Sequence, residues 1–247
     1  MSLTVGTGPF GQAPAGRFNA DLPRDGLLYV EPFLRRMRAL LDGETVVDSR
    51  RVQLVHEHGR LPRCYFPPAD VRMDVLEPRG LVSRHDAPLL EGLVTVEWGA
   101  MDAWFEEDEP ALGHARDPYH RVDALRSSRH VVVSLEGEVL AESSSPTVIY
   151  ETGLPPRWYL PPGDVRVALE PSELRTTCAY KGHAEYHSAR TAAGLVENIA
   201  WTYREPLRDA VPVAGLIAFF NERVDLDVDG ERRPRPQTAW SRPQWWR

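Results

Sequence analysis

The chain has 247 residues and a formal net charge of −7 at pH 7, with 42% hydrophobic and 26% charged residues. This composition is typical of a globular protein with enough apolar material for a packed core, and the length suits two domains better than one. The acidic charge argues against nonspecific binding of nucleic acid, which needs a basic face. Cys64 and Cys178 are the two cysteines, too few for a disulfide framework or a four-thiolate zinc site.

Residues 1–25 are predicted to form an N-terminal arm. They are rich in glycine and proline and lack the basic start and apolar centre of a signal peptide. Farther along the chain, no run approaches the roughly 18 apolar residues that a membrane span needs. We therefore expect a cytoplasmic protein that does not contact a membrane.

The next segment occurs twice. The stretch LDGETVVDSRRVQLVHEHGRLPRCYFPPADVR begins at Leu41, and LEGEVLAESSSPTVIYETGLPPRWYLPPGDVR begins at Leu135. Fourteen of their thirty-two positions are identical, which predicts a tandem duplication of one module. The expected parts are a first module at 26–112, a connector at 113–126, a second module at 127–233 and a C-terminal tail at 234–247.

The two copies differ in length. A second match places Asp102 opposite Asp225, yet Pro78 lies 24 positions before Asp102 while Pro171 lies 54 positions before Asp225. The first copy therefore lacks about thirty residues, among them the counterpart of TTCAYKGHAEYHS. We expect the first module to be functionally silent and the second to hold any site.

Each module is predicted to be mainly β. Asp42-Gly43 and Glu136-Gly137 are hairpin turn signals, and runs such as TVIYE carry the β-branched and aromatic residues that strands favour. Helical character is confined to residues 207–220, where Pro212 interrupts it. The expected fold is two tandem compact modules of antiparallel sheet, each a partly open barrel or a similar shape, with few short helices.

Several motifs resemble a known family, the uncharacterised domain of unknown function 427. They are ETGLPPRWYLPPGDVR, TTCAYKGHAEYHS, VENIAWTYREPL and the arm GTGPFGQAPAGRF, and the likeness spans nearly the whole chain. The resemblance implies a tent-like β-rich module and no established activity, although an old label links the family with nucleotidyltransferases. Family members carry a Cys-Pro-Tyr-Lys-Gly element. Here Ala179 replaces its proline, and the first module lacks the element.

The segment RTTCAYKGHAEYHS, residues 175–188, gathers side chains that can do chemistry. A cation at Lys181 would favour the thiolate of Cys178, which makes these two residues the candidate catalytic pair. Aromatic walls with a few polar anchors are typical of ligand sites. The candidate ligand-binding residues are Arg157, Tyr159, Tyr180, His183, Tyr186, Trp201 and Tyr203. The alternative interpretation makes Cys178 a small buried hydrophobe and Lys181 a solvated turn residue.

The leading hypothesis is thus an unidentified small molecule bound in the second module, with catalysis as its extension. We predict no cofactor and no metal. A second hypothesis is a magnesium-dependent nucleotidyl or phosphoryl transferase using Asp225 and Asp227, which share a strand face; the alternative for these carboxylates is a solvated strand edge. The third is a noncatalytic interaction module. The sequence leaves the oligomeric state open.

Overall fold

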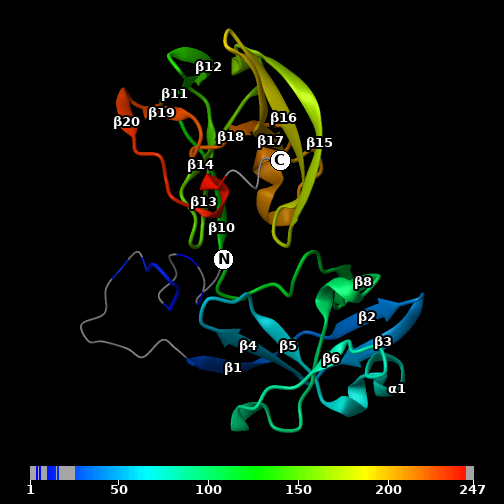
Figure 1. Cartoon of the computed structure of the whole chain (residues 1–247). Helices are drawn as coiled ribbons and strands as arrows, with labels where there is room; N and C mark the ends of the chain where they lie inside the picture. The colour runs from blue at the N-terminus through cyan, green and yellow to red at the C-terminus, as the bar shows by residue number, and fades with distance from the viewer. Residues whose placement is uncertain (1–3, 5, 7–9, 15, 17–25, 243–247) are drawn as a thin grey trace. The chain divides into compact units, whose positions relative to one another are not determined.

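The structure is a computed structural model that describes residues 4, 6, 10–14, 16 and 26–242, so most of the predicted arm lies outside the described residues. The chain divides into two compact units, residues 1–120 and residues 121–247. Both are mostly β, with few short helices, and no sheet of the described part closes into a barrel (Figure 1). The predicted fold class is confirmed. Over the same residues, no helix is long and apolar enough to cross a membrane.

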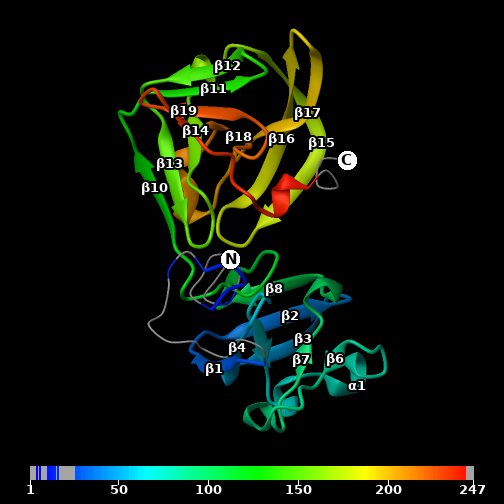
Figure 2. The ribbon, with the colours of Figure 1, turned by 60° about the vertical axis from the view of Figure 1, so that its left-hand side comes forward.

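The first unit holds three small sheets (Figure 2). One has the order β1-β4-β5, from β1 (Leu28–Phe33), β4 (Val52–Glu57) and β5 (Arg63–Tyr65). Another has the order β3-β2-β8-β9, from β2 (Met37–Leu41), β3 (Glu44–Ser49), β8 (Ala103–Glu106) and β9 (Glu109–Pro110). The third pairs β6 (Val82–Ser83) with β7 (Thr95–Val96). The helices are α1 (Met73–Leu76) and the 3₁₀ turns η1 (Pro68–Asp70), η2 (Pro88–Leu90) and η3 (Trp98–Ala100).

The second unit has a larger sheet of order β10-β13-β14-β18-β17-β16-β15. Its strands are β10 (Val122–Arg126), β13 (Thr147–Glu151), β14 (Arg157–Leu160), β15 (Ala168–Cys178), β16 (Gly182–Thr191), β17 (Gly194–Thr202) and β18 (Ile217–Phe219). The other sheet has the order β12-β11-β19-β20, from β11 (Val131–Leu135), β12 (Glu138–Ser143), β19 (Asp225–Val228) and β20 (Glu231–Arg233). Three 3₁₀ turns complete it, η4 (Pro162–Asp164), η5 (Arg208–Val213) and η6 (Ala239–Ser241).

The four-stranded sheets of the two units share details of backbone geometry. Glu107 and Asp229 both adopt a left-handed conformation, each with φ of 54°. Each carboxylate then accepts a backbone N–H at 2.9 Å, from Arg36 and from His130 respectively. A residue with φ > 0 that is not glycine is uncommon, so the same conformation at the same turn of both sheets is a specific similarity between the two units.

The strand register corrects one alignment. Leu40 of β2 pairs with Ala103 in the first unit, and Ser134 of β11 pairs with Asp225 in the second. Because Leu40 and Ser134 occupy matching places in their hairpins, Ala103 is the counterpart of Asp225. The sequence match that placed Asp102 opposite Asp225 was therefore wrong by one residue. Short acidic segments align equally well in either register by composition alone.

The units diverge after β5 and β14. In the second unit, Leu160 pairs with Ile217 of β18, and the sheet continues through the long strands β17, β16 and β15. In the first unit, Phe66 and Val94 exchange backbone hydrogen bonds of 2.7 and 2.9 Å in the matching place. Beyond this point the first unit has only β6 and β7, two strands of two residues each that pair with each other.

Two apolar layers cover the faces of the seven-stranded sheet. Residues such as Trp158, Leu160 and Ile199 pack on one face together with Val133 of β11 and Leu226 of β19. The opposite face carries an aromatic cluster that is described with the site below. Both faces are covered, so the central strands are apolar along their length.

Residues 207–220 depart from the predicted helix. Only Arg208–Val213 forms a helical turn, η5, and it is a short 3₁₀ turn with Pro212 inside it. Ile217–Phe219 forms β18 instead, buried between β14 and β17. Proline withholds the backbone donor that a longer helix would need, and the apolar run after it gains more by completing the sheet.

Candidate functional site

Four predicted site residues share one face of the seven-stranded sheet. Tyr159, Tyr186, Trp201 and Tyr203 are all buried in the aromatic cluster, with η5 and Trp240 packed against them. Alternation along β14 directs Tyr159 to this face and its neighbours Trp158 and Leu160 to the other. The Trp201 indole N–H donates to the Tyr159 hydroxyl at 3.0 Å, and the two rings meet edge to face.

Arg157 lies on the same face and is fully paired. Its guanidinium donates two hydrogen bonds, of 2.7 and 2.5 Å, to the Glu222 carboxylate, and both side chains are buried. It also lies 5.7 Å from the Trp201 ring centre and 5.6 Å from that of Trp240. Burial acts to raise the pKa of Glu222, but the bonds from Arg157 outweigh it and hold that pKa below its usual value. Thr238 donates a further bond of 2.6 Å to Glu222.

Lys181 forms the second buried ion pair. It lies in the turn between β15 and β16, and its ammonium donates to the carboxylate of Glu151 at the end of β13. The two side chains are 10% and 5% exposed, so the pair is shielded from water. Burial by itself would lower the pKa of Lys181, but attraction to Glu151 prevails and raises it above the usual value. The interpretation of Lys181 as a solvated turn residue is therefore wrong.

Cys178 lies at the end of β15, opposite Gly182 of β16, and is half-buried. Its thiol is near enough to interact electrostatically with Lys181 and with Tyr203. Burial raises the pKa of Tyr159 to about 12 and raises that of Tyr203 as well. One thiol, one ammonium, one carboxylate and two phenols thus gather at this end of the sheet. We call Cys178, Lys181 and Glu151 the turn cluster.

The remaining predicted residues are placed differently. Tyr180 is buried within the turn itself. His183 is exposed, on the face opposite to Ala184, where its ring nitrogen Nδ1 lies 3.0 Å from the Thr177 hydroxyl. The structure therefore does not bring His183 to the aromatic face.

The sequence reasoning missed the two carboxylates that pair with the predicted cations. Glu151 ends the apolar strand TVIYE, and Glu222 lies two positions after the apolar run IAFF. A charged residue at the end of a buried strand is a signal for a buried ion pair, because an isolated buried charge is too costly.

The acidic strand β19 pairs with arginines. Asp227 accepts two bonds from Arg232, at 2.9 and 3.0 Å, and Asp225 contacts both Arg232 and Arg235. A magnesium ion would have to displace these guanidinium groups, and we put forward no magnesium-dependent reaction.

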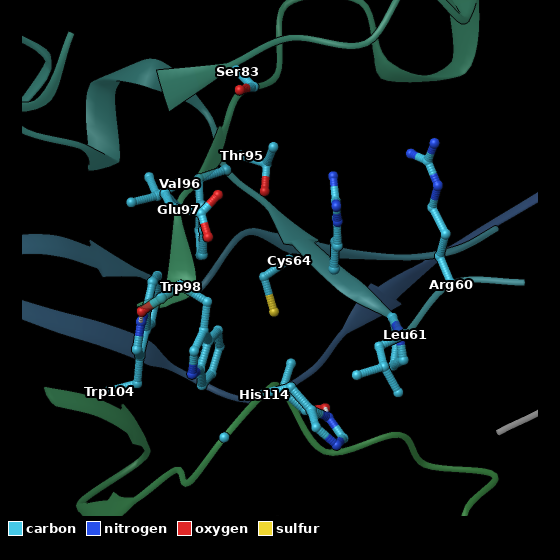
Figure 3. Close-up of a pocket in the computed structure, with 15 residues that line it drawn as sticks. Arg60, Leu61, Cys64, Ser83, Thr95, Val96, Glu97, Trp98, Trp104 and His114 are labelled. Atoms are coloured by element: carbon cyan, nitrogen blue, oxygen red, sulfur yellow. Dashed lines mark hydrogen bonds between the residues drawn. The ribbon is translucent and has the colours of Figure 1, made fainter. Parts of the chain in front are cut away.

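The first unit contains a cavity that the sequence did not predict (Figure 3). It has a volume of about 420 Å³ and lies between β5, the β6–β7 pair and residues 113–115. Burial raises the pKa of the Cys64 thiol, which lines it. In Figure 3 the sulfur is directed toward the space between Trp98 and His114.

The architecture defines the class of the chain as a β-rich protein of two units, each built on small antiparallel sheets. A family model described as Domain of unknown function (DUF427) matches residues 29–87 and 123–230. The chain belongs to this family, as the motifs of the sequence indicated. No curated protein matches the chain.

Proposed function

We propose that the second unit binds a small molecule at the turn cluster. The observation that carries the proposal is a half-buried thiol beside a buried lysine–glutamate pair, Lys181 and Glu151. Ion pairs inside a protein are costly and stabilise a fold less than apolar packing of the same volume would. Ionisable groups in such unusual environments are concentrated at functional sites.

The chemistry available is that of an activated nucleophile. Lys181 keeps its proton because Glu151 stabilises the charge, and this fixed cation lies beside the Cys178 thiol, the nucleophile of the proposed site. Tyr159 and Tyr203, which remain protonated at neutral pH, supply hydroxyl groups beside it. The side chains of Arg157 and Trp201 form the wall behind the turn cluster. Because Arg157 is already bonded to Glu222, it supports the aromatic wall rather than gripping an anionic ligand.

We further infer that the two units are copies of one module and that this thiol site belongs to the second copy. The matched turns at Glu107 and Asp229 support common descent of the units. Cys64 pairs with Leu54 in the register in which Trp158 pairs with Val148, so Cys64 is the counterpart of Trp158 and not of Cys178. The noncatalytic interaction module stays a prediction.

The experiment is alkylation of the native protein by iodoacetamide, with each thiol followed separately by peptide mass spectrometry. Cys178 is expected to react at least about tenfold faster than Cys64, which is buried and has a raised thiol pKa. Lys181→Met should slow the alkylation of Cys178 between pH 6 and 8. Lys181→Arg, which keeps the charge, should slow this alkylation less. Hydrogen exchange of β15 and β16 serves as the folding control. A Cys178 rate that is indifferent to Lys181→Met, with exchange unchanged, would make the turn purely structural.

A further inference from the structure

The cavity of the first unit is built like a ligand site. Trp98 and Trp104 are stacked, with ring centres 4.3 Å apart and planes within 9° of parallel, and Phe66 stacks on Trp104 from 6.1 Å. The Trp104 indole N–H donates to the Trp98 carbonyl at 3.0 Å, which fixes the pair. An aromatic wall held this rigidly presents a flat apolar surface, and a volume of about 420 Å³ falls in the range of small-molecule pockets.

Local topology explains why the space is open. In the second unit three long strands continue the sheet beyond β18. In the first unit the corresponding strand β7 is followed only by the two-residue strand β6. The cavity opens beside this short pair, where Ser83 and Thr95 face each other in register.

A polar group faces the cavity. Thr95 is 8% exposed, and Figure 3 shows its hydroxyl directed into the cavity, on the side toward Cys64. Among the described residues nothing hydrogen-bonds to this hydroxyl. The hydroxyl is therefore available to a polar atom of a ligand that enters the cavity.

The charges at the cavity have opposite signs. Arg60 is paired with Glu57 at 3.0 Å. Arg63 and Glu97, both exposed and both in the cavity lining, have no ion-pair partner within the part of the chain that the structure describes. Arginine is suited to a carboxylate, and a glutamate to an ammonium group. A ligand that carries one charge of each sign could pair with both side chains at once.

We propose that the first unit binds a zwitterionic small molecule of amino-acid size with an aromatic side group. The aromatic group packs against Trp98, beside the polarisable sulfur of Cys64. Its carboxylate bonds Arg63 and the Thr95 hydroxyl, and its ammonium group bonds Glu97. This site is independent of the turn cluster, and it means that the first unit is not functionally silent.

The test is calorimetric titration of the full chain with three matched probes. Tryptophan is the zwitterion, tryptamine lacks the carboxylate, and indole-3-propionate lacks the ammonium group. Tryptophan is expected to bind with a Kd of about 1 mM or tighter, a modest value for a ligand of this size. Each single-charge probe should bind at least about fivefold more weakly, as expected for the loss of one partly exposed charged contact.

Variants locate the contacts. Arg63→Gln should abolish the preference for tryptophan over tryptamine. Glu97→Gln should abolish the preference for tryptophan over indole-3-propionate. Thr95→Val, which keeps the shape, should weaken tryptophan binding about fivefold. Arg50→Gln and Glu91→Gln remove exposed charges that do not line the cavity and should bind like the wild type.

Three results would overturn the proposal: no binding of any probe at 5 mM, equal binding of all three, or unaltered selectivity in both charge variants. Tryptophan binding that is lost in Lys181→Met but kept in Arg63→Gln would move the ligand to the second unit and equally overturn it.

Discussion

Removal of the Lys181 ammonium tests how the second unit is stabilised. In Lys181→Met the apolar stem is retained, but the Glu151 carboxylate stays buried without its cation. Breaking a buried ion pair by removing one partner costs about 3–5 kcal/mol. That range applies here, because the two side chains are only 10% and 5% exposed and the pair is shielded from water.

The double variant Lys181→Met, Glu151→Leu shows how much of the stability lost in Lys181→Met comes from the buried carboxylate left without its cation. Two apolar side chains of similar size leave no stranded charge, and exchanging a buried ion pair for apolar residues is often neutral. We expect the double variant to lie within about 1–2 kcal/mol of the wild type. The single variant should therefore be the less stable of the two, although it carries fewer changes.

Hydrogen exchange by mass spectrometry is the suitable assay, because a chain of two units need not unfold in one transition. Peptides from β13 and β16 report the free energy of opening around the pair, and peptides from β2 and β4 are the internal control. A cost below about 1 kcal/mol for Lys181→Met, or a double variant no better than the single one, would refute the reasoning.

The pH dependence has a definite sign. The pKa of Lys181 is raised in the folded state above its ordinary value of 10.5. Its contribution to stability is therefore fully present below pH 10.5 and is lost as the pH rises through the folded value. The difference in stability between the wild type and the single variant Lys181→Met, followed by denaturant unfolding, should fall only above that pH.

Further changes test other contacts of the second unit. The pKa of Glu222 is held below its ordinary value of 4.5, so its contribution to stability is present above pH 4.5 and is lost as the pH falls through the folded value. Urea unfolding should show this loss of stability in acid for the wild type, and less of it for Glu222→Gln. Thr238→Ala removes the bond to Glu222 and an N-cap, and should cost about 1–2 kcal/mol in the same assay, whereas no change would mean that the tail is not docked. Glu136 has a φ of 51°, so Glu136→Asn should stabilise the unit by about 0.5 kcal/mol; a loss in melting temperature would contradict this.

Local patterns in the sequence were enough to predict much of the fold. The Asp42-Gly43 and Glu136-Gly137 hairpins, the strands on either side of Lys181 and the alternation of DLDVD follow from turn chemistry and side-chain period, which act over a few residues. The sequence also indicated that Tyr159 and Trp201 would lie in one aromatic group, since aromatic residues on neighbouring strands pack against one another.

Tertiary structure decided the rest. The partners Glu151 and Glu222 lie thirty and sixty-five positions away from the cations that they neutralise, a separation over which the sequence carries no pairing rule. Strand order alone sets which charges meet. The cavity beside Thr95 has the same origin, because it exists where the sheet stops at β6. The end of a sheet leaves no local pattern in the sequence that predicts the space beyond it, and only the packing of the chain around that edge reveals it.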